Sequence, residues 1–403
     1  MDRGVWRWLL LAGALACGGQ EPAPAAPPPP EAPAPSAPAP APPPPPSGPA
    51  PAPVRFQPAF HQALRWTLRV ESLTTFRLRV PLGRAGGRVR LAFRAGGGAL
   101  QLQRASVARA GAGETPASAP LPLSFAGAPG ASASAGERVV SDPLALQVAR
   151  GEELFVTFEA RGALAVSAIG ALPGGRARSG AWALEAGALR GERWRRAVGL
   201  ATLEVEGVPG PAVVAVGDSI TEGYLNGADD VRKAWPGVAQ ARLGVPVLNA
   251  GVSGQGLYDA LANLDAEVLV LEEVSDCVVL LGTNDLGAQP DTVQLRTRLA
   301  RLFERLRPHC TVWAATLLPK ERTTRGSYAQ VREQRLVVNR WLREEAKVAG
   351  VIDLEAATRS SASVHQFAPG LDGDGIHPSA KGQRVMGEEV ARFLRAQGLT
   401  GPP

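Results

Sequence analysis

Four short groups of glycines and polar residues have the types and the order that acyl transfer requires. The first is Gly217-Asp218-Ser219, which directly follows the apolar run 213–216. The others lie at 249–251, 282–285 and 372–378. Acyl transfer needs a nucleophile, a base, a group that orients the base and donors for the oxyanion. Ser219 is the candidate nucleophile; the alternative is that Asp218 and Ser219 only cap the following helix.

The last group supplies the partners that Ser219 would need. His377 is the candidate base, because a neutral imidazole accepts the serine proton. Asp374 stands three residues before His377 and is the candidate for orienting the imidazole. Asp372 is a rival for that role, with a poorer spacing to the histidine.

The two middle groups supply candidate donors for the oxyanion. These donors are the backbone N–H of Gly251 and the side-chain amide of Asn284. They would act together with the backbone N–H of Ser219. The chain has no paired-histidine spacing, and its three cysteines are far apart in sequence. We therefore expect neither a metal site nor a cofactor.

The elements that must position these residues can be predicted from hydrophobic spacing. Short apolar segments predict buried strands at 213–216, 246–249, 277–281, 311–316 and 351–354. Apolar residues at helical spacing predict helices around 295–306, over 327–349 and from 386 to 394. Ser379 is the expected N-cap of the last helix. This alternation predicts an α/β fold with a parallel sheet covered on both faces, whose strand ends share one crevice.

Taken in this order, the four groups resemble the SGNH (GDSL-type) hydrolase family. The resemblance covers residues 209–399 and rests on Gly217-Asp218-Ser219 with Gly223, Gly251 after Asn249, Gly282-x-Asn284-Asp285 and Asp374-x-x-His377. It implies a three-layer α/β/α sandwich and metal-free ester hydrolysis. It also implies a triad of Ser219, Asp374 and His377, and an oxyanion hole formed by Ser219, Gly251 and Asn284. The chain lacks the G-x-S-x-G pattern, which argues against an α/β-hydrolase elbow.

The expected activity is therefore the hydrolysis of carboxylic esters, and the expected substrate is an O-acetylated polysaccharide or other glycan. The layout, with a β domain before Ser219, also looks like a two-domain subgroup often linked to polysaccharide deacetylation. A lipase or lysophospholipase is the rival within the class, because the same triad serves both. A non-catalytic glycan-binding lipoprotein is the alternative from another class. The net charge of +6 forms no basic block, so no nucleic-acid partner is expected, and the oligomeric state stays open.

Residues 54–208 are expected to form an antiparallel β-sandwich or jelly roll. Alternating segments at 75–80 and 88–93 are flanked by glycine, and further strands are expected at 99–104, 144–148, 154–160 and 200–206. His61 is the only histidine in this region, so the region cannot build a catalytic set alone. We expect it to pack beside the catalytic domain. The alternative is glycan binding, with Trp182 and Trp194 as stacking platforms.

The amino terminus has the features of a secretory signal. Residues 1–17 combine a basic start, a short apolar run and small residues before a break, and the run is too short to span a bilayer. Because it ends at Cys17, it resembles a bacterial lipoprotein signal, although Leu15 stands two places before the cysteine rather than three. We expect a lipid anchor at Cys17 that holds the protein to the bacterial cell envelope outside the cytoplasm, with plain secretion as the alternative. The Pro/Ala-rich residues 18–53 predict a disordered tether.

Cys277 and Cys310 fall at the starts of neighbouring strands in the implied sheet, ~4.8 Å apart. Export would admit a disulfide between them. The side chains of adjacent parallel strands stand side by side, however, which is an awkward geometry for a bridge. We therefore expect two buried free thiols, with a disulfide as the alternative.

Overall fold

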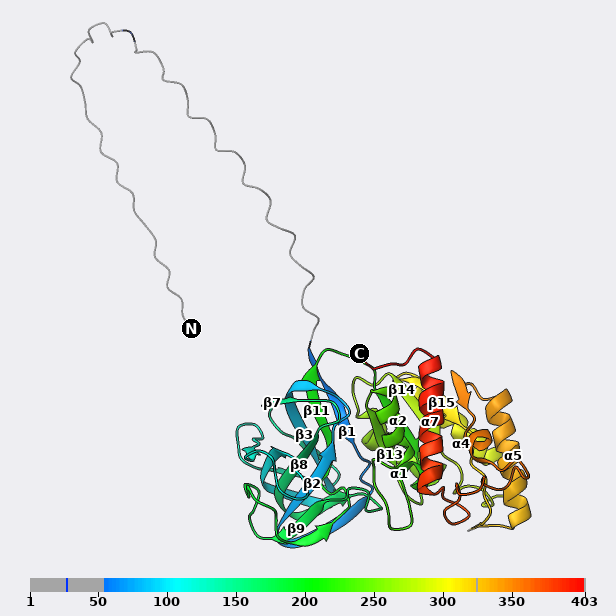
Figure 1. The fold of residues 1–403 in the computed structure, drawn as a ribbon, viewed down its shortest axis with the longest axis horizontal. Coiled ribbons are helices and arrows are strands. Elements are labelled where there is room, and N and C mark those ends of the chain that lie inside the picture. Colours follow the sequence, from blue (N-terminus) through cyan, green and yellow to red (C-terminus); the bar gives the residue numbers. More distant parts are fainter. Residues whose placement is uncertain (1–26, 28–53, 324, 402–403) are drawn as a thin grey trace, which may run out of the picture. The chain divides into compact units, whose positions relative to one another are not determined.

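The structure, a computed structural model, describes residue 27, residues 54–323 and residues 325–401. The predicted signal peptide at 1–17, Cys17 and all but one residue of the tether at 18–53 lie outside the described residues. Residues 52–403 form one compact unit that contains two sheets (Figure 1). No helix in the described part is both long enough and apolar enough to cross a membrane.

Residues 55–207 form an antiparallel sheet of 11 strands. They are β1 (Arg55–His61), β2 (Trp66–Pro81), β3 (Gly86–Arg109), β4 (Leu121–Pro122), β5 (Ala131–Ala133), β6 (Arg138–Val140), β7 (Leu144–Val148), β8 (Glu153–Val166), β9 (Gly175–Ser179), β10 (Glu192–Trp194) and β11 (Leu200–Gly207). The first half of β3 pairs with β11, β6 and β7, and its second half pairs with β8, β4 and β5. The predicted antiparallel pairing is confirmed, but the hydrogen bonding is continuous rather than divided between two separate sheets.

The two tryptophans considered as sugar platforms are both partly buried. The Trp194 ring packs edge-on against Phe76 in the core of the antiparallel sheet, at 5.0 Å between ring centres. The guanidinium of Arg178 lies 3.5 Å from the centre of the Trp182 ring. Each ring is therefore partly buried and has a packing partner within the protein.

The second sheet is parallel and has five strands in the order β13-β12-β14-β15-β16. They are β12 (Val213–Gly217), β13 (Val247–Gly251), β14 (Asp276–Leu280), β15 (Thr311–Ala315) and β16 (Gly350–Ile352). All five predicted strands are confirmed within a few residues. The chain starts at β12, goes outward to β13 and then returns to β14 on the other side. In such sheets ligands bind beyond the carboxyl ends of the strands where the order reverses, which here is between β12 and β14.

Helices cover both faces of the parallel sheet. They are α1 (Ser219–Glu222), α2 (Trp235–Leu243), α3 (Leu257–Leu264), the π-helix η1 (Asp265–Leu269), α4 (Val293–Leu306), α5 (Tyr328–Glu344), α6 (Leu354–Thr358) and α7 (Ala380–Ala396). Val214 and Val216 of β12 pack in one buried cluster with α3, α4 and α5. Val213 and Ala215 pack in another with α2 and α7, which lie side by side in Figure 1. Successive residues of a strand point to opposite faces, so both faces must be apolar, as the sequence of β12 is.

The antiparallel region covers an edge of the parallel sheet. β13 is the edge strand, and Gln62, just after β1, forms a parallel bridge with Asn249 of β13. The next residue continues this pairing, since the Ala63 N–H donates to the Asn249 carbonyl at 3.0 Å. An uncovered edge strand is prone to pair with other chains. The contact agrees with the expected packing of residues 54–208 beside the catalytic domain.

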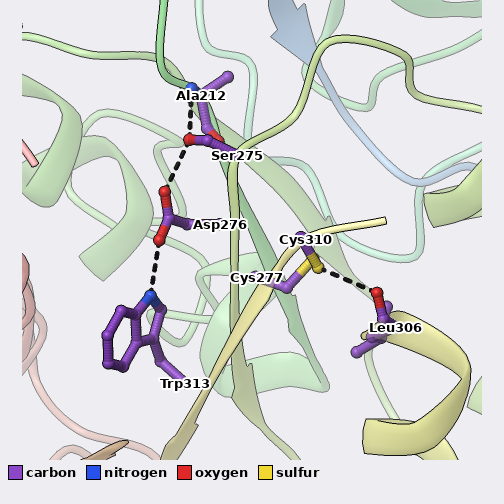
Figure 2. Close-up of a disulfide and its surroundings, with 7 residues drawn as sticks. All are labelled: Ala212, Ser275, Asp276, Cys277, Leu306, Cys310 and Trp313. Atoms are coloured by element: carbon purple, nitrogen blue, oxygen red, sulfur yellow. Dashed lines mark hydrogen bonds between the residues drawn. A yellow bond between two sulfur atoms is a disulfide. The ribbon is translucent and has the colours of Figure 1, made fainter. Parts of the chain in front are cut away.

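The expectation of two free thiols is wrong: Cys277 and Cys310 form a disulfide, with 5.8 Å between their α-carbons (Figure 2). Cys277 lies in β14, where it is paired with Val312 of β15, and Cys310 precedes the first residue of β15. Side chains of adjacent parallel strands stand side by side only when both residues belong to the regular strands. Cys310 instead lies in the turn after α4, where its N–H donates to the Leu306 carbonyl, and this turn brings its side chain toward Cys277.

Candidate active site

The structure brings together three side chains that the sequence singled out. The Ser219 Oγ lies 2.8 Å from His377 Nε2. On the other side of the imidazole, His377 Nδ1 lies 2.9 Å from Asp374 Oδ2 and 3.2 Å from Oδ1. This is the order nucleophile, base and orienting carboxylate that acyl transfer requires.

A sharp turn at the end of β12 positions Ser219. Asp218 caps the four-residue helix α1, and its Oδ1 accepts the Ile220 N–H at 3.0 Å, which agrees with a bracing role for this residue. Glycine is needed at 217, because a Cβ there would lie 2.0 Å from Thr221 Oγ1 and 2.7 Å from the Leu280 carbonyl oxygen. The turn thus places Ser219 at the carboxyl end of β12, beside the point where the strand order reverses.

The loop before α7 positions the other two residues. Asp374 Oδ1 accepts the backbone N–H groups of Ile376 and His377, at 3.0 and 2.8 Å, and this fixes the carboxylate beneath the imidazole. Asp372 does not contact His377; its Oδ1 accepts the Gly375 N–H at 2.7 Å and so shapes the loop. Ser379 caps α7 as predicted, and its Oγ accepts the Gly382 N–H.

The hydrogen bonds of Asp374 favour its charged form. Partial burial raises the pKa of this carboxyl, but the hydrogen bonds from the N–H groups of His377 and Ile376 and from the imidazole outweigh burial. The pKa of Asp374 therefore lies below its ordinary value of 3.8. An ionised carboxylate at this place holds the imidazole in one orientation and stabilises its protonated form.

The structure contradicts the choice of Gly251 as an oxyanion donor. Gly251 is buried within β13, and its N–H donates to Asn249 Oδ1 at 2.9 Å. Gly254 lies three residues further along, is exposed, and has a φ of +81°. Its N–H has no acceptor among the residues that the structure describes. The sequence could have indicated Gly254, because this glycine also follows the predicted strand. The strand ends two residues later than predicted, however, so Gly251 belongs to the strand rather than to the loop.

The other two donors remain available. The Ser219 N–H, at the first position of α1, has no acceptor in the described part of the chain. Asn284 follows β14, and its Nδ2 donates one hydrogen to the Gln255 carbonyl at 2.9 Å. A side-chain amide has two N–H donors, so the second stays free. The Gln255 contact also ties Asn284 to the loop that carries Gly254.

Residues 215–385 match the profile of the family described as GDSL-like Lipase/Acylhydrolase. The protein is a hydrolase that acts on ester bonds. All the candidate catalytic and oxyanion residues fall within the matched segment. The match supports the GDSL-type resemblance that the four sequence groups indicated.

Several solved structures resemble part of this hydrolase. An aryl esterase from M. Smegmatis is 20% identical, covers 46% of this chain and 99% of its own, and has a TM-score of 0.39. A carbohydrate acetylesterase from Sinorhizobium meliloti is 17% identical, with coverages of 46% and 99% and a TM-score of 0.37. A lipase/acylhydrolase from Enterococcus faecalis is 24% identical, with coverages of 46% and 96% and a TM-score of 0.39. No protein with a curated description matches the chain.

A polar cavity of about 240 Å³ opens beside the oxyanion donors of the hydrolase. Gly254 and Asn284 form part of its wall, and Tyr258 contributes a ring that is 69% exposed. Much of the remaining wall is charged or amide-bearing: Asp259, Asp285, Gln289, Gln294, Arg298 and Arg325. A larger cavity of about 440 Å³ lies between β1 and α2. None of Ser219, Asp374 and His377 lines either cavity, but Gly254 and Asn284 line only the smaller of the two.

Tyr224 lies against the imidazole of His377, a contact that the sequence did not indicate. Its ring centre is 4.4 Å from that of His377, with the two planes tilted by 50°. Tyr224 directly follows the C-cap Gly223 of α1, and its N–H donates to the Ser219 carbonyl at 2.9 Å. The ring thereby limits the orientations open to the imidazole of the hydrolase.

Two buried ionisable residues, Asp218 and Lys320, interact electrostatically. Burial raises the pKa of Asp218 from 3.8 to about 7, and the charge of Lys320 partly opposes this rise. Burial also lowers the pKa of Lys320, whose Nζ donates to the Thr283 carbonyl at 2.9 Å. Among the described residues, no three His, Cys, Asp or Glu side chains lie together as a metal site would need.

Proposed function

We propose that the protein is a serine carboxylester hydrolase that forms an acyl-enzyme on Ser219 and acts on O-acetylated glycans. The observation that carries the proposal is the contact of 2.8 Å between Ser219 Oγ and His377 Nε2, backed by Asp374 on the other imidazole nitrogen. A capping role for Ser219 would need neither partner. The profile match over residues 215–385 supports the same reaction class.

The proposed reaction has two halves. Ser219 Oγ attacks the acyl carbon while His377 Nε2 takes the hydroxyl proton, and His377 then gives this proton to the oxygen of the leaving alcohol. In the second half, His377 takes a proton from water, and the resulting hydroxide attacks the acyl carbon. The carboxylic acid leaves as the proton returns to Ser219 Oγ. Asp374 keeps its charge throughout and stabilises the imidazolium.

We place Gly254 in the oxyanion hole in place of Gly251, together with Ser219 and Asn284. A free, exposed N–H in a loop that is hydrogen-bonded to Asn284 supports this choice. The crystal structure of a covalent phosphonate adduct of Ser219 tests it. The phosphonyl oxygen is expected within ~3.1 Å of the nitrogens of Gly254, Ser219 and Asn284. An adduct oxygen bonded to the Gly251 nitrogen would overturn the assignment.

The cavity beside Asn284 favours a hydroxylated substrate over a lipid. Its carboxylate, guanidinium and amide groups suit the hydroxyls of a sugar, and they would lose hydration without compensation against a fatty chain. The exposed Tyr258 ring provides a flat apolar face, with the Arg298 guanidinium 5.8 Å from its centre. A lipase or lysophospholipase needs an apolar channel of the length of its acyl chain.

Chain-length preference separates the substrate classes. We expect the purified protein to hydrolyse p-nitrophenyl acetate much faster than the p-nitrophenyl esters of long-chain fatty acids, and to release acetate from acetylated glycans. The Ser219→Ala variant, folded by circular dichroism, is the control and should be inactive. A preference for long-chain esters would favour the lipase. Inactivity of the wild type on all esters would favour a non-catalytic binding protein.

We also propose export, with a lipid anchor at Cys17. The signal-like residues 1–17 and the Pro/Ala-rich residues 18–53 motivate this, and the Cys277–Cys310 disulfide supports an oxidising compartment. Mass spectrometry of the protein from membranes decides between the anchor and plain secretion. A lipidated amino-terminal peptide beginning at Cys17 is expected, and a cleaved peptide without lipid would overturn the anchor.

A further inference from the structure

Glu222, the last residue of α1, joins three separate backbone segments through one buried carboxylate. Its Oε1 accepts the N–H groups of Ala168 and Ile169, at 2.9 and 3.1 Å. Its Oε2 accepts the N–H of Ser253 at 2.6 Å. The first two donors follow β8 of the antiparallel region, whereas Ser253 directly precedes Gly254. One side chain thus links the antiparallel region, the helix of the nucleophile and the oxyanion loop.

Because the Glu222 carboxylate is buried, it depends on its three N–H donors. The Glu222 residue is 0% exposed, and no ion pair with it is found in the described part of the chain. Burial raises the pKa of Glu222, and its hydrogen bonds with Ser253, Ile169 and Ala168 oppose that rise. A buried carboxylate without a cation is costly unless N–H groups satisfy its oxygens. The carboxylate and its three donors therefore hold one another in place.

We propose that Glu222 is a positioning residue for the oxyanion loop 252–255, and that residues 167–169 of the antiparallel region take part in catalysis through it. The inference rests on the proposed hydrolysis at Ser219. Ser219 and Glu222 share a helix of only four residues, so a change in one end of the helix moves the other. A carboxylate that fixes Ser253 relative to this helix sets the distance between the nucleophile and the N–H of Gly254.

Within the antiparallel region, Arg196 fixes the segment that donates to Glu222. The Arg196 guanidinium donates from Nε to the Ser167 carbonyl at 2.9 Å and from Nη2 to the Ala168 carbonyl at 3.1 Å. These bonds orient the peptide groups whose N–H groups face Glu222. In the described structure Arg196 makes no hydrogen bond with Ser219, Asp374 or His377, so its replacement tests the link from outside the active site.

A simpler explanation is that Glu222 only helps to dock the antiparallel region, and Glu267 provides the comparison. Glu267 is also a buried carboxylate that joins the two sheets, since it accepts the Leu64 N–H at 3.1 Å and pairs with Arg94. It forms no hydrogen bond with residues 252–255 in the described structure. Loss of docking alone should therefore affect both glutamates alike.

The test compares Glu222→Gln and Arg196→Ala with the matched controls Glu267→Gln and Arg176→Ala. Arg176 forms an ion pair with Glu114 within the antiparallel region and makes no hydrogen bond with residues 167–169 in the described structure. A small displacement of a catalytic group can cost ~10²-fold in rate. We expect Glu222→Gln to lower kcat on p-nitrophenyl acetate by roughly 10- to 100-fold and Arg196→Ala by a smaller factor, with KM within about twofold. Both controls should keep kcat even where their melting temperature falls.

Two results would overturn the proposal. One is a folded Glu222→Gln variant that keeps kcat, and the other is a loss of kcat in Glu267→Gln as large as in Glu222→Gln. Hydrogen exchange of the Ser253 amide gives a readout that does not depend on hydrolysis: exchange should be faster in Arg196→Ala than in Arg176→Ala. Equal exchange rates of the Ser253 amide in these two variants would also contradict the proposed link between Arg196, Glu222 and Ser253. Should Ser219→Ala keep full activity, the proposed function fails, while the exchange result still decides whether the link exists.

Discussion

The Oγ of Ser219 lies 2.8 Å from the Nε2 of His377, although the two residues are 158 positions apart in the sequence. The fold explains this closeness. Ser219 follows β12, the second strand in the sheet order, and His377 lies in the loop that leads back to α7. α7 packs beside α2 on the same face of the sheet as Val213 and Ala215 of β12. The helix that closes the fold thus returns the base to the strand that carries the nucleophile.

Asp374→Asn should reduce hydrolysis strongly, because an amide cannot hold the imidazole in the same tautomer or stabilise its charge. In a serine protease with this arrangement the corresponding loss in kcat is ~10⁴-fold, and we expect a loss of about 10³- to 10⁴-fold here. Asp372→Asn is the matched control, since its side chain only accepts the Gly375 N–H and an asparagine keeps an acceptor oxygen. Steady-state kinetics on p-nitrophenyl acetate measures both. Equal losses in the two variants would mean that loop shape, rather than orientation of His377, explains the effect.

Asn284→Ala tests the oxyanion donor. The free N–H of its amide is expected to matter most when negative charge develops, so kcat should fall by ~10²–10³ with little change in KM. Gln101→Ala removes an exposed amide from β3 that does not line this cavity, and it should leave kcat nearly unchanged. If instead Asn284→Ala raised only KM, Asn284 would bind substrate rather than the oxyanion.

Asp218→Asn should change how stability depends on pH. Burial raises the pKa of Asp218 from 3.8 to about 7, so between these values the folded protein keeps a proton that the unfolded chain has released. The free energy of unfolding contributed by this group therefore falls as the pH rises from about 4 to about 7. Asparagine does not titrate and keeps an acceptor for the Ile220 N–H.

Melting temperatures of the two proteins across this pH range provide the measurement. The difference, variant minus wild type, should increase from about pH 4 to about pH 7 and then level off. Asp372→Asn, at an exposed position, serves as the control for the general effect of removing a carboxylate. A difference that stays constant with pH would show that Asp218 titrates in its ordinary range.

The parallel sheet and the grouping of Ser219, Asp374 and His377 could be predicted because their signals are local. Val213–Gly217 is a buried apolar run that ends in glycine, and β13 also ends in glycine. Asp374 and His377 are three residues apart, so one turn suffices to pair them. The helix α2 was not predicted, because Trp235–Leu243 contains proline and glycine and shows no apolar stripe.

Other features depend on contacts that no local pattern encodes. The choice between Gly251 and Gly254 rests on where β13 ends, and hydrogen bonds to Asn249 decide that point. The segments 88–93 and 99–104 were expected as two strands, yet β3 continues through the glycines between them because β8 pairs with both ends of this stretch. The role of Glu222 depends on residues 168 and 169, which lie more than 50 positions away.

The disulfide between Cys277 and Cys310 should stabilise the fold to a measurable degree. It closes a loop with a sequence separation of 33, and the chain-entropy model gives about 4 kcal/mol for a loop of this length. The bridge connects the start of β14 to the turn before β15, so its loss frees the whole of α4 in the unfolded chain. The double variant Cys277→Ser/Cys310→Ser should therefore unfold at a lower urea concentration than the wild type.

Because both sulfurs lie at the opposite end of the strands from Ser219, kcat should not change. Dithiothreitol should lower the midpoint of the wild type toward that of the variant, and mass spectrometry of the unreduced protein should yield a linked peptide pair. Two alkylated cysteines in that experiment, or identical urea midpoints, would contradict the disulfide and favour the two free thiols that the geometry of adjacent strands had suggested.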